Sequence, residues 1–247
     1  MAGRVAFWPI EFNTLAYQAV FNNHLMVQAL WFTILLTFVY TALSLLMTVL
    51  CAYPLSRKDL KGRSVLLVYI VFTMYFNGGM IPEYLNIKEL GLINNFWSLV
   101  LPGLISTYNM ILMKTYFQNL PIELEESARV DGASDTRIML SIILPLSKAT
   151  LATIALFYAV ARWNNFSDSL LYINDAKMYT LQLRLRQIIS ENQCDEIIHD
   201  SVEIQNHLVP ETIKAACLIF SMVPILLVYP WLQKYFVKGV VIGSIKG

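Results

Sequence analysis

The sequence predicts an all-α protein that crosses a membrane several times. Hydrophobic residues make up 57% of the 247 residues and charged residues only 14%, whereas soluble domains carry about 25% charged residues. The mean hydropathy is +0.55. Several apolar runs reach the roughly 20 residues that a helix needs to cross about 30 Å of hydrocarbon. These observations indicate a polytopic membrane protein.

Five apolar runs are candidates for spanning helices, namely residues 26–53, 64–82, 97–117, 138–163 and 212–237. The second is interrupted by NGGMIP between Asn77 and Pro82. Prolines inside the other runs are Pro102, Pro145, Pro224 and Pro230. Membrane helices tolerate proline where neighbours satisfy the freed carbonyl groups, so we expect kinks at these positions rather than helix ends.

Basic residues predict the orientation, because loops rich in Lys and Arg stay in the cytoplasm. The loops 54–63 and 114–137 are basic, as is the C-terminal tail, whereas the loop 83–96 contains only Lys88. We therefore expect these basic segments on the cytoplasmic side of the membrane and the segment 83–96 on the outer side.

This orientation divides the chain into three parts. We expect an outer N-terminal segment (1–25), a transmembrane domain (26–237) and a cytoplasmic tail (238–247). Five spans leave the N-terminus outside without an export signal, which suggests a further span ahead of this sequence, with a start outside the membrane as the alternative. The outer loop 164–211 is too long for a simple turn, and its sequence LQLRLRQII at 181–189 predicts a short amphipathic element.

Residues 125–146 read EESARVDGASDTRIMLSIILPL, which puts a polar stretch directly before a membrane run. We expect Asn119 to cap a short helix, with Pro121 in its first turn and glutamates complementing its positive end. The helix should end near Val130 or Asp131, because Gly132 can adopt a left-handed backbone.

A second helix should begin at Ser134, a good capping residue, and enter the membrane near Ile138. A helix lying on lipid headgroups favours Lys and Arg on its polar face, whereas the first short helix begins with three glutamates. The composition therefore favours a protein partner over the membrane surface.

The same stretch resembles a signature of one transporter family. Glu126-Ser127-Ala128, then Gly132, Ile142 and Leu144-Pro145, have the spacing of the EAA signature of ABC importer permeases, with serine in place of the first alanine. FWPIEFNTLAYQAVF, AYPLSRKDLKGR and YFVKGVVIGSIKG also resemble this group. The resemblance covers almost the whole chain and is to maltose-type carbohydrate permeases, with the alginate and complex-oligosaccharide branch most similar.

The resemblance implies a type I importer fold, usually with six spans, and a non-catalytic permease subunit. The segment 121–132 would be the coupling helix, which docks on a dimeric ABC ATPase that holds ATP and Mg; this chain itself would hold no cofactor. A second homologous permease would complete a heterodimer, and a periplasmic or lipid-anchored binding protein would deliver the sugar. No nucleic acid is implied.

The resemblance also suggests roles for individual residues. The predicted ATPase-coupling residues are Glu125, Glu126, Ser127, Ala128, Arg129, Asp131, Gly132 and Ala133. For the sugar path, which needs aromatic faces and hydrogen-bond donors, the candidates are Tyr108, Asn109, Lys148, Asn164 and Asn165. Lys148 and Arg162 would face carboxylates if the sugar is a polyuronate, although Arg162 also fits a headgroup contact. The candidates for binding-protein contact are Arg184 and Arg186.

Two other function classes fit the sequence less well. An ion-coupled sugar transporter usually places Asp or Glu inside a span, and none of the five runs does so in its interior. A membrane enzyme is not favoured, because the sequence has no HExxH or paired-carboxylate pattern. His199 with Asp195, Glu196 and Asp200 could suggest a metal site, but a solvated loop is the favoured interpretation. The sequence also lacks GxxxxGK[ST], so a phosphate-binding loop must come from another chain.

Overall fold

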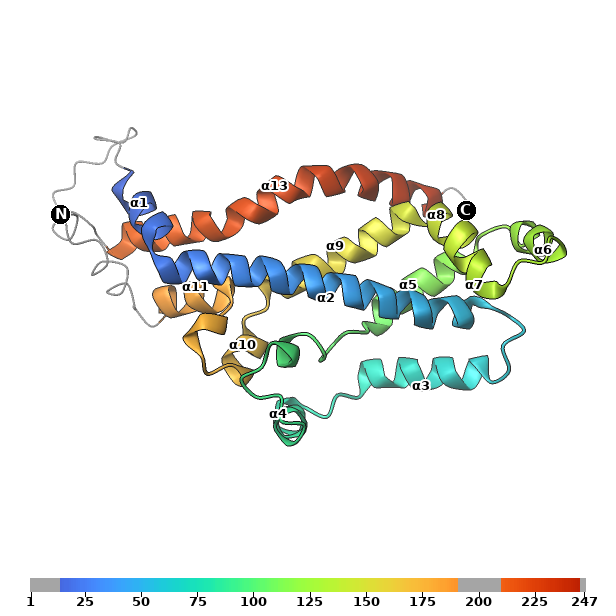
Figure 1. Cartoon of the computed structure of the whole chain (residues 1–247), viewed down its shortest axis with the longest axis horizontal. Helices are drawn as coiled ribbons and strands as arrows, with labels where there is room; N and C mark the ends of the chain where they lie inside the picture. Colours follow the sequence, from blue (N-terminus) through green and yellow to red (C-terminus); the bar gives the residue numbers. More distant parts are fainter. Residues whose placement is uncertain (1–13, 191–209, 245–247) are drawn as a thin grey trace.

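The fold was obtained as a computed structural model that describes residues 14–190 and 210–244, with side chains up to Val228. These residues form helices and turns, with no strand among them (Figure 1). The helices are α1 (Leu15–Asn22), α2 (His24–Ser56), α3 (Arg63–Tyr75), α4 (Met80–Glu89), η1 (Phe96–Leu99), α5 (Thr107–Gln118), α6 (Glu123–Val130), α7 (Asp135–Ile138), η2 (Met139–Ile143), α8 (Leu144–Leu146), α9 (Lys148–Asn164), α10 (Ser167–Tyr172), η3 (Ala176–Met178), α11 (Leu181–Ser190) and α13 (Pro210–Ser244). The predicted all-α class is confirmed.

Helix α2 is the central element of the bundle (Figure 1). It is continuous over 33 residues, about 50 Å at 1.5 Å per residue. Its N-terminus is capped by Asn23, whose side chain accepts a hydrogen bond from the backbone N–H of Met26 (2.9 Å). Helices α5, α9 and α11 pack along it, while α9 also packs against α13. The two ends of the bundle are called here the α6 end and the α1 end.

A buried polar cluster holds the centre of this bundle together. The Tyr158 hydroxyl on α9 lies 2.7 Å from the Thr48 hydroxyl on α2 and accepts the backbone N–H of Ser106 (3.0 Å). Tyr40, also on α2, donates to the carbonyl of Gly103 (2.8 Å). These bonds tie the non-helical segment before α5 to both long helices.

Replacing Tyr158 with Phe should destabilise the subunit. The change leaves Thr48 and the Ser106 N–H without their buried partner, which costs about 1–3 kcal/mol. We expect a lower melting temperature in detergent, measured by fluorescence-detected size exclusion. The control is Tyr116→Phe, which removes one exposed hydrogen bond to the Leu146 carbonyl (3.1 Å). A melting temperature for Tyr158→Phe no lower than that of the control would contradict the cluster's contribution.

Two predicted spans are sharply bent. Helices α3 and α4 meet at 111°, with the break at the predicted NGGMIP sequence, and Gly79 has φ of 90°. The predicted span 138–163 is bent by 81° between Leu146 and Lys148, a break rather than a mild kink. There the π-helical η2 precedes Pro145, which has no N–H to donate, and the Ser147 hydroxyl bonds the carbonyl of Ile143 (2.7 Å).

The predicted span 97–117 is helical only from Thr107 to Gln118, apart from the short η1. Pro102 and Gly103 interrupt it, since Gly103 has φ of 73°, and the Ser106 side chain then caps α5. Within the described residues, two helices are therefore long and apolar enough to span a membrane alone, α2 and residues 210–228 of α13. Each bent pair adds one if it is counted as a single span, giving four.

The segment after α9 folds onto the α1 end of the bundle. The predicted amphipathic element is confirmed as α11, which buries Leu181, Leu185 and Ile188 in a cluster with α1 and α13. The backbone N–H of Leu181 donates to the Thr33 hydroxyl of α2 (2.8 Å). Residues 1–13, 191–209 and 245–247, which include the His199 cluster and parts of the predicted outer and tail segments, lie outside the described residues.

Candidate functional site

Helix α6 projects from one end of the bundle (Figure 1). The predicted short helix is confirmed, but its predicted start is wrong. Asn119 ends α5, with its N–H bonded to the carbonyls of Thr115 and Tyr116, and Ile122 precedes α6 without any side-chain cap. Leu120 and Pro121 form the turn between the helices, so Asn119 lies too early to cap α6.

The C-terminus of α6 is closed by a Schellman motif. The N–H of Gly132 bonds the carbonyl of Arg129 (3.0 Å), and the N–H of Ala133 bonds the carbonyl of Ala128 (2.9 Å). Gly132 has φ of 77°, as predicted. Ser134 then caps α7 by accepting the N–H of Arg137 (3.4 Å), also as predicted. Two caps one residue apart therefore fix the angle between α6 and the following helix.

The inner face of α6 is held by a buried ion pair. Glu125 and Ala128 are buried, whereas the other residues of the helix are exposed. The Glu125 carboxylate pairs with Arg57, which follows α2. Arg57 stacks on the ring of Tyr53 with 4.3 Å between guanidinium carbon and ring centroid. Tyr53 in turn donates to the backbone carbonyl of Asp135 (3.3 Å). Glu125, predicted as an ATPase contact, thus points into its own subunit.

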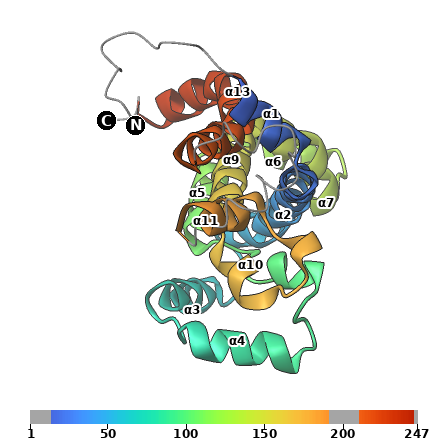
Figure 2. The same ribbon diagram turned by 90° about the vertical axis from the view of Figure 1, so that its left-hand side faces the viewer.

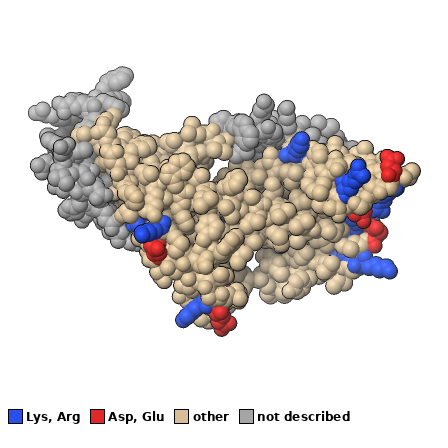
Figure 3. Space-filling view, viewed as in Figure 1, with Lys and Arg blue, Asp and Glu red and all other residues tan. Residues whose placement is uncertain are grey.

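The outer face of α6 combines exposed apolar side chains with carboxylates. Val130 is 88% exposed and Ile122 60%. Glu126 and Asp131 are exposed, as is Ser127, while Ala133 is half-buried. Arg129 is also exposed and pairs with Asp135 (2.9 Å). In the space-filling view, charged side chains gather at this end of the molecule, and a largely uncharged surface covers its middle (Figure 3). Such a mixed face suits contact with another protein better than with solvent alone.

The predicted sugar-path residues do not form one site. Tyr108 is 56% exposed, but Asn109, its neighbour, is buried. Lys148 is exposed beside the bend before α9, so it does not lie inside a continuous span. Asn164 donates to the carbonyl of Val160 in its own helix (2.9 Å), and Asn165 donates to Asp168 (3.1 Å). The side-chain amides of Asn164 and Asn165 therefore make local contacts in this conformation.

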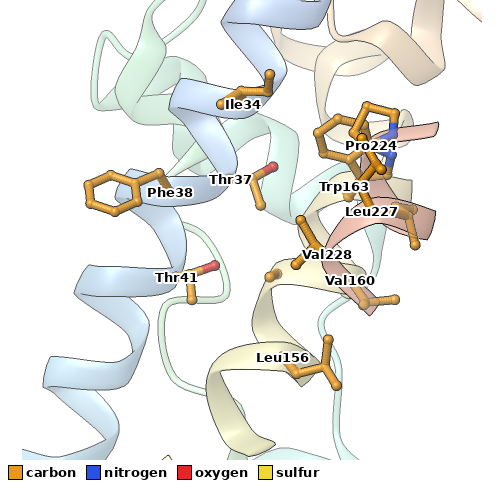
Figure 4. Close-up of a pocket in the computed structure, with 12 residues that line it drawn as sticks. Ile34, Thr37, Phe38, Thr41, Leu156, Val160, Trp163, Pro224, Leu227 and Val228 are labelled. Carbon is orange, nitrogen blue, oxygen red and sulfur yellow. The ribbon is translucent and has the colours of Figure 1, made fainter. Parts of the chain in front are cut away.

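A groove of about 450 Å³ lies between α2, α9 and α13. Figure 4 shows Thr37 and Thr41 projecting from α2 toward the other two helices. Their hydroxyls and the indole N–H of Trp163 are buried and have no hydrogen-bond partner in the described structure. The remaining lining is aliphatic or aromatic, namely Ile34, Phe38, Leu156, Ala159, Val160, Pro224, Ile225, Leu227 and Val228. This groove is too apolar for a hydroxyl-rich sugar, and none of the predicted path residues lines it.

Arg162 is buried rather than turned toward headgroups or a substrate. It pairs with Asp168 (2.8 Å), and its guanidinium lies 4.4 Å from the centroid of the Tyr40 ring. Arg184, predicted to contact a binding protein, is buried with its guanidinium over the Tyr179 ring (4.9 Å). Arg186 lies over Phe166 (4.8 Å) and is half-buried. Burial of Arg184 corrects the expectation that it presents its charge outward.

Sequence reasoning did not assign roles to Arg57 or Asp168. Both are ordinary loop or helix-start residues in sequence, and only the fold brings them to their partners 68 and 6 residues away. Within the described ranges, no group of three or more His, Cys, Asp or Glu is placed to hold a metal ion.

Comparison with known proteins supports the resemblance. Residues 29–242 match the family model "Binding-protein-dependent transport system inner membrane component". LplC of Bacillus subtilis is 46% identical over 97% of this chain and 81% of its own length. The polygalacturonan/rhamnogalacturonan transport system permease protein YtcP of the same organism is 43% identical over 97% of this chain and 84% of its own.

A solved structure has the same fold. It is the crystal structure of a bacterial ABC transporter involved in the import of the acidic polysaccharide alginate. One of its chains superposes with a TM-score of 0.89 at 35% identity, covering 95% of this chain and 83% of that chain. The type I importer fold that the resemblance implied is therefore confirmed. The chain belongs to the family of binding-protein-dependent transport system inner membrane components, the non-catalytic permease subunits of ABC importers.

Proposed function

We propose that this chain is one of two different permeases in an importer that carries uronate-containing oligosaccharides into a bacterial cell. A dimeric ABC ATPase, which holds ATP and Mg, docks on α6, and a periplasmic or lipid-anchored protein delivers the sugar. The observation that carries the proposal is the outer face of α6, where exposed Val130 and Ile122 lie among exposed carboxylates. A cleft with an apolar floor and a basic rim is the complementary partner surface.

The proposed orientation rests on charge. The α6 end carries Arg57, Lys58 and Lys61 in the turn after α2, Arg129 in α6 and Arg137 in α7. By the positive-inside rule this end faces the cytoplasm. The α1 end, with the N-terminus of this sequence, then faces outward, where α10 and α11 lie within reach of a binding protein. The C-terminal tail of this sequence lies in the cytoplasm.

The substrate class rests on the names of two similar proteins. YtcP is named for polygalacturonan and rhamnogalacturonan, and the solved transporter for the acidic polysaccharide alginate. Galacturonans and alginate are both polymers of uronic acids, so a carboxylate on each acidic ring is their shared chemistry. We therefore infer that the imported oligosaccharide carries carboxylates.

Reconstitution of the whole importer tests this function. The chain, its partner permease, the ATPase and the binding protein would be co-purified and placed in proteoliposomes. We expect ATP-dependent uptake of oligogalacturonate or oligoalginate, and little uptake of a neutral malto-oligosaccharide of equal length. Uptake of the neutral sugar alone would overturn the substrate class. Uptake that needs an ion gradient but no ATP would overturn the ATP-driven mechanism.

The exposed apolar face of α6 gives a direct mutational test of docking. Val130→Asp puts a carboxylate where an apolar contact is proposed, and desolvating it on docking should lower ATPase retention at least tenfold. The matched control is Val130→Thr, which keeps the side-chain shape and should stay within about threefold of wild type. Retention is measured as the ATPase-to-permease ratio after affinity purification. Equal retention by both variants would contradict docking through Val130.

A further inference from the structure

The ion pair between Arg57 and Glu125 is the main polar link between α6 and the long helix α2. Glu125 lies on the inner face of α6, away from the proposed docking face, and 7% of its side chain is exposed. Arg57 lies immediately beyond the last residue of α2, and 19% of its side chain is exposed. By contrast, the other ion pair that α6 makes, Arg129 with Asp135, is 50% and 71% exposed. Only the first pair is sheltered enough to hold two elements together firmly.

Apart from Ala128, which is buried in a cluster that includes Tyr53 and Leu55 of α2, little else fixes α6 against the end of α2. A cleft of about 580 Å³ lies between them, and Arg57 and Glu125 themselves line it. Ile122 and Glu126 also line it, so these two residues border both the cleft and the proposed docking face. In Figure 1, α6 stands clear of the bundle. Without Arg57 and Glu125, a displacement of α6 could therefore occur in this cleft without moving α2.

Arg57 is held in place by contacts with α2, which in turn packs against α5. Its guanidinium stacks on Tyr53 of α2 (4.3 Å), and the Tyr53 ring packs edge-on against Phe117 of α5 (6.1 Å between centroids). Gln118 of α5 also donates to the carbonyl of Ser56 (3.3 Å). A force applied to Arg57 is therefore transmitted to α2 and α5 together.

Helix α2 then connects this point with the other end of the subunit. From Arg57 to Thr33 it rises about 36 Å without a break. There the Thr33 hydroxyl accepts the N–H of Leu181 (2.8 Å), and Gln28 donates to the carbonyl of Lys177 (3.4 Å). The segment just before α11 is thus bonded to the same helix that Arg57 terminates.

We propose that Arg57 and Glu125 form the mechanical joint through which movement of α6 is passed to α2, and from there to the segment Lys177–Leu181 at the α1 end. This role rests on the proposed docking of an ATPase on α6. Both are positioning residues: neither contacts substrate or nucleotide. Breaking the pair of Arg57 and Glu125 should therefore uncouple ATP hydrolysis from transport while the ATPase stays docked on α6.

The test uses the reconstituted importer with its binding protein and an acidic oligosaccharide. Glu125→Gln removes the charge but keeps the shape of the side chain. We expect ATPase retention within about twofold of wild type, with the stimulation of ATP hydrolysis by loaded binding protein reduced at least tenfold. Basal ATP hydrolysis by the Glu125→Gln importer, measured without binding protein, should change by a smaller factor than the stimulation does. The matched control is Asp135→Asn, which removes the exposed pair and should keep the full stimulation ratio.

A charge exchange guards against a merely structural effect. Arg57→Glu combined with Glu125→Arg restores opposite charges across the joint, so we expect it to recover at least a third of the stimulation lost in Glu125→Gln. Full stimulation in Glu125→Gln would overturn the joint, as would an exchanged variant that retains the ATPase but recovers nothing. Loss of the ATPase from Glu125→Gln would also overturn it, because the residue would then support docking.

The failure of the proposed function would look different. In that case the wild-type chain itself would retain no ATPase, or its uptake would not depend on ATP. Such a result would remove the joint together with the docking on which it rests, whereas the variant results above leave docking by the wild-type chain intact.

Discussion

Gly132→Val should leave the permease in the membrane but reduce sugar uptake at least tenfold. Gly132 has φ of 77° in the Schellman motif that closes α6. A side chain there meets no atom within 4 Å, so crowding is not the cause. The left-handed backbone costs an L-residue about 1–2 kcal/mol, and a β-branched one is especially disfavoured. The chain should relieve this strain by turning α6 away from its docking angle. Uptake into proteoliposomes, normalised to inserted protein, measures the effect.

The fold provides a matched control away from α6. Gly91 closes α4 with the same motif: its N–H bonds the carbonyl of Lys88 (3.0 Å), and the N–H of Leu92 bonds that of Ile87 (3.1 Å). Its φ is 67°, and an added Cβ again meets nothing within 4 Å. Gly91→Val should therefore carry the same local strain but retain uptake within about twofold. Similar uptake by the two variants would mean that the angle of α6 does not matter for coupling.

Asp168→Ala should be among the most destabilising single changes in the subunit. It leaves Arg162, whose side chain is only 5% exposed, without its carboxylate partner (2.8 Å). Removing one member of a buried ion pair costs about 3–5 kcal/mol, and the partial exposure of Asp168 favours the lower limit. For a chain of this size, 3 kcal/mol corresponds to a fall of roughly 6–12 °C in melting temperature. Thermal unfolding of the purified complex measures it.

A second change separates the cost of the unpaired charge from lost packing. Arg162→Met in the Asp168→Ala background removes the stranded guanidinium and keeps much of its volume, so part of the stability should return. The control is Asp135→Ala, which breaks an exposed pair and should cost about 0.5 kcal/mol. If Asp168→Ala costs no more than this control, Arg162 must be satisfied by other groups, and the ion pair is not a main support of the α9–α10 junction.

Local chemistry made several features predictable. The glutamates, Gly132 and Ser134 each act within one turn of the chain, so their spacing predicted α6, its end and the start of α7. The break at Asn77–Pro82 was predicted for the same reason, because glycine and proline act on their own backbone. The sequence LQLRLRQII likewise predicted an amphipathic element at α11. Its helical form was not predicted, because leucine alternates with polar residues over the first six positions.

Other features depend on contacts between distant segments. The span 97–117 is as apolar as a membrane-spanning helix. Its backbone is nevertheless non-helical just before α5, where Gly103 is hydrogen-bonded by Tyr40 and Ser106 by Tyr158. Glu125 looks like its neighbour Glu126 in sequence, and only the position of Arg57 turns it inward. Arg162 and Arg184 could be predicted as charges near the membrane, but their partners could not, since these depend on how the chain folds back after α9.

The short length of α3 has a consequence for how this protein is made. Its 13 residues rise about 20 Å, less than the roughly 30 Å of hydrocarbon, and none of them is buried. Figure 2 shows α3 and α4 set apart from the rest of the bundle. The residues 76–79 between them are non-helical and exposed, and lipid offers no hydrogen-bond partner to backbone outside a helix. Without a partner subunit, the side of the protein formed by α3 and α4 is therefore poorly suited to lipid. The cellular lifetime of the chain should depend on how soon after synthesis a partner subunit covers this side.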